Sequence, residues 1–156
     1  MSTIQEDELF MRGALDEARL AFQEGEVPVG ALIVRNGEVV ARTHNKVEAM
    51  RQGTAHAELL ALRSASETLG NWRLDDCTLY VTKEPCPMCA GAMVNCRLSR
   101  LVYGCADSVF GAAGGRMDVL ALPGYLHNVQ CVSGVLADEC LSLIQDFFRQ
   151  RRASRK

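Results

Sequence analysis

The sequence predicts an α/β fold in which helices cover both faces of a mixed β-sheet. Helical and strand-like patterns alternate along the 156 residues in the order αββαβαβ(α)βα. Asn36-Gly37, between two short apolar runs, is the strongest two-residue signal for an antiparallel hairpin. The segment from Cys105 to Asn128 is longer than a hairpin needs and permits a parallel crossover, so both kinds of strand pairing are expected.

The amino-terminal part predicts a helix followed by the hairpin. Residues 5–24 place apolar side chains at helical spacing among charged ones, and Gly25 ends the pattern. The two strands of the hairpin are expected over Val27–Val34 and Val39–Thr43.

The middle of the chain predicts two helices with a strand between them. Thr54 is the expected N-cap of a helix that runs to about Leu69 and is closed by Gly70. A strand is expected over Thr78–Thr82. Pro87 suits the first position of the next helix, which runs to about Cys96 with Cys86 as its cap.

The carboxy-terminal part predicts two short strands and a final helix. The strands are expected over Leu101–Tyr103 and near Val129–Val132, with a helical pattern around Met117–Leu122 between them. The last helix covers about residues 136–152. Its end is basic: the last eight residues hold five Arg or Lys and no acid. This basic tail has two interpretations. It could bind a few phosphates, or it could be a solvated helix end whose cations complement the helix dipole.

Length and composition indicate one globular domain over residues 1–156, because the chain has 48% hydrophobic and 23% charged residues. No run of 18 apolar residues predicts a membrane span. The acidic start lacks the basic region of a secretory signal, so we expect a cytoplasmic protein without a membrane partner. The net charge of −2 argues against a protein that coats nucleic acid indiscriminately.

Seven cysteines are present, and two of them belong to the motif described next. The others are expected to be reduced, mostly buried thiols, and a disulfide framework is the weaker alternative. These five are Cys77, Cys96, Cys105, Cys131 and Cys140.

The most informative motif is His56-Ala57-Glu58 followed by Pro85-Cys86-Pro87-Met88-Cys89. One imidazole and two thiolates make three zinc ligands, and Glu58 lies two residues from the imidazole. Catalytic zinc sites keep a position for water, whereas structural sites are closed by four protein ligands. The H-x-E and P-C-x-x-C pattern is known from zinc-dependent nucleobase deaminases. It predicts that zinc activates a water and that Glu58 shuttles its proton to a heterocycle and then to the leaving amine.

Other interpretations of these residues remain open. A Cys-x-x-Cys pair also suits a redox pair or a structural zinc site, and a structural site would need Cys96 or His44 as its fourth ligand. Glu58 by itself could be a solvated helix residue. Because both halves of the motif start predicted helices, whose free N–H groups favour thiolates, we expect them to meet at one zinc ion.

Over nearly its whole length the sequence resembles the bacterial tRNA-specific adenosine deaminases of the cytidine-deaminase-like superfamily. The zinc signature alone fits any zinc-dependent base deaminase. Two further motifs look specific to the tRNA enzymes: Gly111-Ala112-Ala113-Gly114 and the ending Phe147-Phe148-Arg149-Gln150-Arg151-Arg152.

The resemblance implies a three-layer α/β/α fold with a five-stranded mixed sheet, a homodimer, and one zinc ion per subunit held by His56, Cys86 and Cys89. It implies deamination of adenosine to inosine at the wobble position of the anticodon stem-loop of tRNA, with Glu58 as the proton shuttle. The residues implied to bind the substrate are Asn45, Val29, Ala57, Asp107, Phe148 and Arg152. Asn45 would hydrogen-bond the flipped nucleotide, Asp107 the neighbouring ribose, and the last two the anticodon loop.

Some positions depart from the family pattern that we expect. Gln52-Gly53 replaces a more usual Asp-Pro, Lys83 stands in place of Leu, and Val109-Phe110 occurs where a Lys is common. The last change removes one expected phosphate contact, which would add affinity without carrying sequence information.

Two other functions compete with this prediction. A deaminase of a free base or nucleoside, such as cytosine, cytidine or guanine, would keep the zinc chemistry, and it would turn over free nucleosides as fast as a stem-loop. A non-catalytic zinc-stabilised RNA-binding module would have four protein ligands, and Glu58→Gln would then change nothing measurable.

Overall fold

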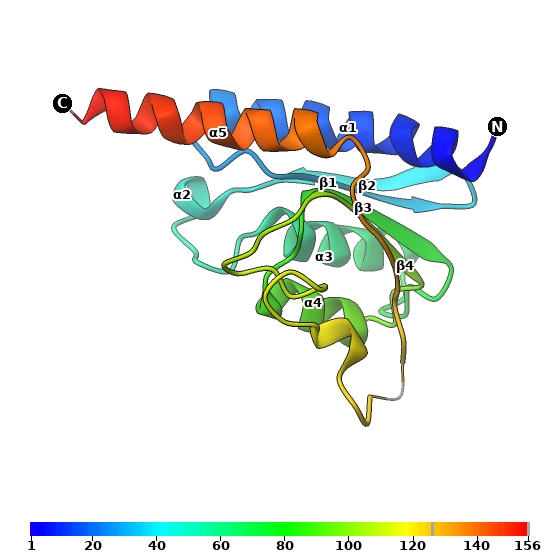
Figure 1. The fold of residues 1–156 in the computed structure, drawn as a ribbon. Helices are drawn as coiled ribbons and strands as arrows, with labels where there is room; N and C mark the ends of the chain where they lie inside the picture. The colour runs from blue at the N-terminus through cyan, green and yellow to red at the C-terminus, as the bar shows by residue number, and fades with distance from the viewer. Residues whose placement is uncertain (126, 156) are drawn as a thin grey trace.

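The structure, a computed structural model, describes residues 1–125 and 127–155 (Figure 1). Leu126, within the predicted connection, and Lys156, at the end of the predicted domain, lie outside the described residues. The elements in chain order are α1 (Thr3–Gln23), β1 (Gly30–Arg35), β2 (Glu38–His44), α2 (Val47–Met50), α3 (Ala57–Leu69), β3 (Cys77–Lys83), α4 (Pro87–Asn95), β4 (Arg100–Cys105), the 3-10 turn η1 (Val119–Ala121), β5 (Gln130–Val132) and α5 (Ala137–Ser154).

The five strands form one mixed sheet, as predicted, and their order in it is β2-β1-β3-β4-β5. β1 is antiparallel to both β2 and β3, whereas β3, β4 and β5 run parallel to one another. Asn36 and Gly37 make the hairpin turn with φ of 52° and 78°, values that suit this residue pair. The predicted parallel crossover between β4 and β5 is confirmed.

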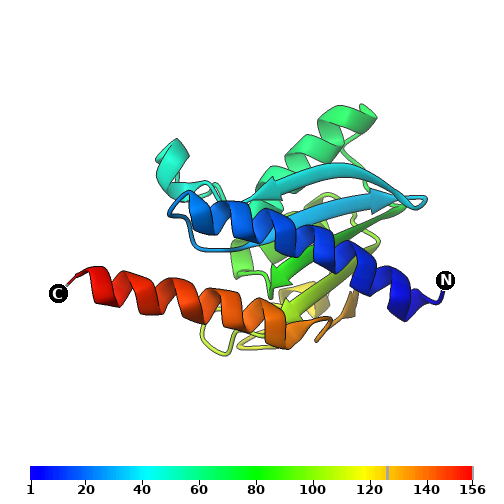
Figure 2. The same ribbon diagram turned by 90° about the horizontal axis from the view of Figure 1, so that it is seen from above.

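Helices lie on both faces of the sheet, which confirms the three-layer α/β/α prediction. α1 and α5 run side by side over one face, and α3 and α4 cover the other (Figures 1 and 2). Neighbouring residues of β1 point to opposite faces of the sheet. Leu32 packs with α1, and Ile33 packs with α3 and α4. Both side chains are fully buried, so each face of the sheet has its own core.

Two glycines let α1 and α5 approach the sheet closely. A Cβ on Gly30 would collide with backbone atoms of Ala14 and Ala18 in α1. A Cβ on Gly104 would collide with the sulfur of Cys140 in α5. Because these two positions have no side chain, α1 and α5 pack directly on the strands that lead to the site.

Three local predictions differ from the structure, and one short helix was not predicted. α3 begins at Ala57 with His56 as its N-cap instead of Thr54, because the backbone of His56 is still extended. Residues 47–50 form the short helix α2, which no clear pattern marks. The strand predicted from Val27 begins at Gly30, since the N–H of Val29 donates to Val27 and not to the sheet. The helical pattern around 117–122 becomes only the single turn η1.

None of the helices in the described residues is long and apolar enough to cross a membrane.

Candidate active site

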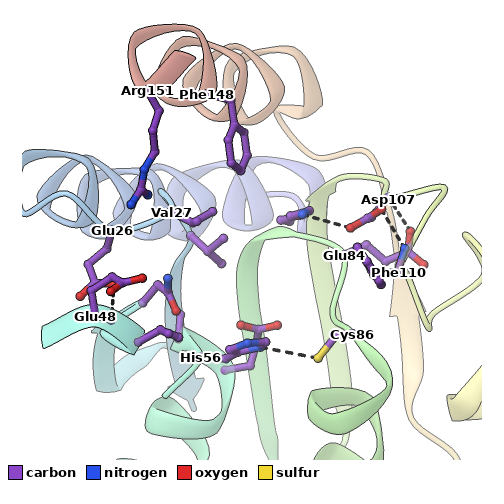
Figure 3. Close-up of a pocket in the computed structure, with 16 residues that line it drawn as sticks. Glu26, Val27, Glu48, His56, Glu84, Cys86, Asp107, Phe110, Phe148 and Arg151 are labelled. Atoms are coloured by element: carbon purple, nitrogen blue, oxygen red, sulfur yellow. Dashed lines mark hydrogen bonds and ion pairs between the residues drawn. The ribbon is translucent and has the colours of Figure 1, made fainter. Parts of the chain in front are cut away.

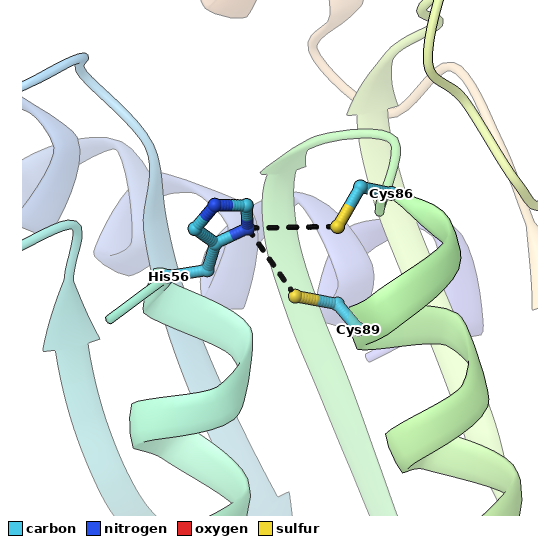
Figure 4. Close-up of side chains that lie close together, drawn as sticks. All are labelled: His56, Cys86 and Cys89. Carbon is cyan, nitrogen blue, oxygen red and sulfur yellow. Dashed lines mark hydrogen bonds between the residues drawn. The ribbon is translucent and has the colours of Figure 1, made fainter. Parts of the chain in front are cut away.

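Three side chains from the amino ends of two helices meet at one point (Figure 4). His56 is the N-cap of α3, Cys86 is the N-cap of α4, and Cys89 lies in the first turn of α4. Nδ1 of His56 lies 3.5 Å from Sγ of Cys86 and 3.5 Å from Sγ of Cys89. The predicted meeting of the two halves of the motif is therefore present in the structure.

The local environment favours a thiolate at Cys86. Hydrogen bonds from the Cys89 thiol, from His56 and from the backbone N–H of Cys89 outweigh burial and lower the pKa of Cys86 to about 4. The pKa of Cys89 is raised, chiefly because it donates its proton to Cys86. Free N–H groups at the start of α4 act in the same direction on Cys86.

The donor set fits a zinc ion. Zinc with tetrahedral geometry, about 2.0 Å from nitrogen and about 2.3 Å from sulfur, would hold these atoms about 3.5 Å apart. His56, Cys86 and Cys89 are the potential metal cluster of the described residues. The two candidate fourth ligands lie elsewhere: His44 contacts Glu17 at 3.0 Å and Glu24 at 2.8 Å, and Cys96 follows the far end of α4.

Glu58 lies in the first turn of α3, two residues beyond His56, with 4% of its surface exposed. Burial raises the pKa of its carboxyl to about 7, against the opposing effects of a backbone N–H and of His56. A carboxyl with this pKa can accept and return a proton near neutral pH, which is what general acid–base catalysis requires.

A cavity of about 390 Å³ is lined by His56, Glu58 and Cys86. Figure 3 shows His56 and Cys86 at its floor. Ligand sites of small molecules commonly have volumes of this order. Five of the six predicted substrate-binding residues line this cavity: Val29, Asn45, Ala57, Asp107 and Phe148.

The sixth predicted residue, Arg152, does not line the cavity. It borders a shallow hollow along α5 with Phe148, while its neighbour Arg151 lines the cavity and points into it (Figure 3). Successive residues of a helix project about 100° apart, so a shift of one position moves a side chain to another face. Helical periodicity could have identified Arg151 as the cavity residue if the face of the last helix that points to the cavity had been known.

Asp107 follows β4 and is held by several donors. Its Oδ1 accepts the backbone N–H of Val109 at 2.9 Å and of Phe110 at 3.0 Å, and its Oδ2 lies 3.0 Å from Nζ of Lys83. Burial alone would raise the pKa of Asp107, but these donors outweigh it and lower the pKa. Lys83, a departure from the expected pattern, thus places a cation beside the cavity.

Glu84 is a site residue that sequence analysis missed. Its buried carboxylate accepts the backbone N–H groups of Asp107 at 2.9 Å, Ala113 at 3.0 Å and Gly115 at 2.7 Å. A Cβ on Gly111 or Gly115 would collide with this carboxylate. The glycines were therefore a signal for a group that needs space beside the loop, although they could not identify Glu84.

Glu26 was also missed. It is 1% exposed, and its carboxylate accepts the backbone N–H groups of Glu48 at 3.0 Å and Ala49 at 2.8 Å. It thereby holds α2 at the edge of the cavity, which Val47 and Glu48 line.

Known proteins share this architecture. A family model described as MafB19-like deaminase matches residues 5–152. The tRNA-specific adenosine deaminase of Bacillus subtilis (strain 168) is 46% identical over 151 residues, covering 97% of this chain and 94% of that protein. The chain belongs to the family of tRNA-specific adenosine deaminases. A second such deaminase, from Streptococcus pyogenes serotype M18 (strain MGAS8232), is 41% identical over 99% of this chain and 97% of its own length.

Solved structures agree with this membership. A chain from a study of A-to-I editing by tRNA:A34 deaminases at the wobble position of transfer RNA superposes with a TM-score of 0.81. It is 41% identical and covers 86% of this deaminase and 97% of its own chain. The guanine deaminase of Nitrosomonas europaea has a TM-score of 0.78 at 24% identity, covering 90% of this chain and 83% of its own, and it shares the fold. The predicted family and fold are confirmed.

Proposed function

We propose that this protein hydrolyses adenosine to inosine at the wobble position of a tRNA anticodon. Membership of the tRNA-specific adenosine deaminases supports the reaction and the substrate. The observation that carries the proposal is the meeting of His56, Cys86 and Cys89 beside a buried Glu58 at one cavity.

We assign zinc, one ion per subunit, to His56, Cys86 and Cys89. When bound, zinc supplies a water whose pKa is lowered to about 7, so that a nucleophile is available at neutral pH. Glu58 takes a proton from the attacking water and delivers it to N1 of the adenine ring. Protonation at N1 makes C6 electrophilic, and oxygen adds there. Glu58 then carries the proton of the new C6 hydroxyl group to the amino nitrogen, the C6–N6 bond breaks, and ammonia leaves as C6 becomes a carbonyl.

Cavity residues position the base for this transfer. Val29 and Ala57 supply apolar surface, and Asn45 offers an amide that can hydrogen-bond the nucleotide. Asn45 is 7% exposed, and its backbone is held because its N–H donates to the carbonyl of Val29 at 3.0 Å. A buried side chain on a held backbone has fewer conformations to lose when it orients a substrate.

The surroundings of the cavity suit an RNA loop. We assign Asp107 to the ribose of the neighbouring nucleotide, and Phe148 and Arg152 to the anticodon loop. A wobble nucleotide is already unpaired, so its extrusion costs less than opening a duplex. We further propose that the enzyme acts as a homodimer in the cytoplasm, where tRNA is modified.

The test uses zinc-loaded protein with an anticodon stem-loop that carries adenosine at the wobble position. Free adenosine, guanine and cytidine are assayed beside it. Inosine in the stem-loop, with negligible ammonia from the free compounds, is the expected result. Rapid release of ammonia from a free base or nucleoside, with the RNA untouched, would overturn the substrate and leave the site chemistry in place.

A further inference from the structure

Two adjacent apolar side chains project from the loop after β4 without a place in either core. Val109 is 63% exposed and Phe110 is 66% exposed. Their positions differ in one respect, because Phe110 lines the cavity and Val109 does not. Figure 3 shows Phe110 on the side of the cavity that carries Asp107, opposite Glu48. Exposure alone would need no explanation, but this ring is exposed at the cavity itself, where a ligand can cover it.

The backbone beneath the ring is firmly held. The N–H of Phe110 donates to Oδ1 of Asp107 at 3.0 Å, and the N–H of Asp107 donates to the buried carboxylate of Glu84 at 2.9 Å. The N–H of Gly111 donates to the carbonyl of Asp107 at 3.0 Å. A ring with two torsions on a fixed backbone loses little conformational freedom on binding, so its contacts are retained as affinity.

Cations accompany the ring. Lys83 and Arg151 both line the cavity, and Nζ of Lys83 lies 3.0 Å from the same Asp107 that holds the Phe110 backbone. Aromatic rings beside basic side chains form the usual platform for single-stranded nucleic acid, in which bases stack and phosphates meet cations.

We propose that Phe110 forms a stacking subsite for an unpaired base directly next to the nucleotide that is deaminated. The inference rests on the proposed function, since it requires an RNA substrate. The target base enters the cavity towards Glu58, and its covalently linked neighbour remains at the side where Phe110 is exposed. Because every base has a π-face, the subsite accepts any base at that position.

The experiment compares Phe110→Ala and Phe110→Tyr, with Val109→Ala as the matched control from the same loop. Dissociation constants and kinetics are measured with the zinc-loaded proteins and a wobble-adenosine stem-loop. We expect Phe110→Ala to raise Kd and KM about five- to 150-fold, in line with removal of one base stack, with little change in kcat. Phe110→Tyr keeps the ring, and Val109→Ala removes a side chain outside the cavity, so both should bind like wild type.

Abasic stem-loops identify the partner of the ring. A loop lacking the base 5′ of the target and another lacking the base 3′ of it are bound to wild type and to Phe110→Ala. Stacking predicts that the effect of Phe110→Ala disappears with one of these loops. Equal binding by Phe110→Ala and wild type on the intact loop, or an effect that persists on both abasic loops, would overturn the subsite. Failure of wild type to form inosine would instead overturn the proposed function.

Discussion

Glu58 combines burial with a position in the first turn of α3, beside the His56 and Cys89 side chains. We predict that Glu58→Gln lowers kcat for the stem-loop about 10²- to 10⁴-fold, the range that general acid–base catalysis contributes. The amide has the same shape, so bound zinc and the unfolding temperature should stay close to wild type. Single-turnover inosine formation with metal analysis checks this. A kcat within a few fold of wild type would exclude Glu58 as the proton carrier.

The carboxylate of Glu84 fills the space that Gly115 leaves open. We predict that Gly115→Ala displaces the loop bearing Asp107 and destabilises the fold by about 1–3 kcal/mol, because its Cβ would collide with that carboxylate. It should also raise KM for the stem-loop. Gly53→Ala is the control, since a Cβ there meets open space. Urea unfolding of both variants tests this prediction. Equal midpoints would contradict the tight packing of Glu84 against Gly115.

For single residues, sequence spacing was sufficient to predict that the side chains of a short motif lie together. His56, Glu58, Cys86 and Cys89 lie together because each pair starts a helix, and helix starts could be predicted. Glu84 could not be predicted in this way. Its partners are backbone N–H groups 23 to 31 residues away. Gly115, one of these partners, marks a need for space beside the loop, but the sequence does not show which side chain fills that space.

α5 carries the basic end of the chain along the cavity and the adjoining hollow. We predict that Arg151→Ala combined with Arg152→Ala weakens stem-loop binding and flattens its salt dependence. The slope of log K against log salt should fall by about 0.7 for each RNA phosphate that the protein no longer neutralises. Binding measured over a range of salt concentrations tests this. Arg73→Ala is the control, because Arg73 precedes β3, whose opposite end leads to the cavity, and is paired with Asp75. An unchanged slope in the double variant would contradict phosphate binding by this helix.

α1 is tied to the sheet by a buried carboxylate. Asp7 is 3% exposed; it accepts the Tyr80 hydroxyl at 2.9 Å and both guanidinium arms of Arg100 at 2.7 and 2.6 Å. Asp7→Ala should destabilise the protein by about 2–4 kcal/mol, since it leaves a largely buried guanidinium without its partner.

Asp16→Ala on the same helix is the matched control. Asp16 pairs with Arg19 at the surface, where such pairs contribute about 0–1 kcal/mol. Denaturant midpoints of the two variants should therefore differ clearly. Equal midpoints would show that the buried network contributes no more than the surface pair.

At the element scale, periodicity and turn signals predicted the strands, the hairpin and the four long helices. The mixed pairing followed from connection lengths. α2 was not predicted, because it has only four residues, too few for a periodic pattern. Its amino end is held by Glu26, which lies more than twenty residues earlier in the sequence. The start of α3 shifted by two residues because hydrogen bonds of the preceding turn, such as Lys46 to Ala55, hold Thr54 outside the helix.

The whole molecule places two cores on one sheet, with the site where the amino ends of α3 and α4 meet. We predict that zinc removal by a chelator abolishes inosine formation and lowers the temperature of a single unfolding transition, because a bound metal stabilises the folded state. Added zinc should restore both. A chelated protein with full activity would contradict the assignment of the three ligands.

Under the proposed function, water replaces the amino group of a wobble adenosine at this site. The most direct measurement is mass spectrometry of the nucleosides from a stem-loop treated with zinc-loaded protein in ¹⁸O-labelled water. We expect inosine that carries the heavy oxygen at C6, formed at the wobble position alone and only at trace rates by Glu58→Gln. Unmodified adenosine in the stem-loop, or inosine without the label, would contradict it.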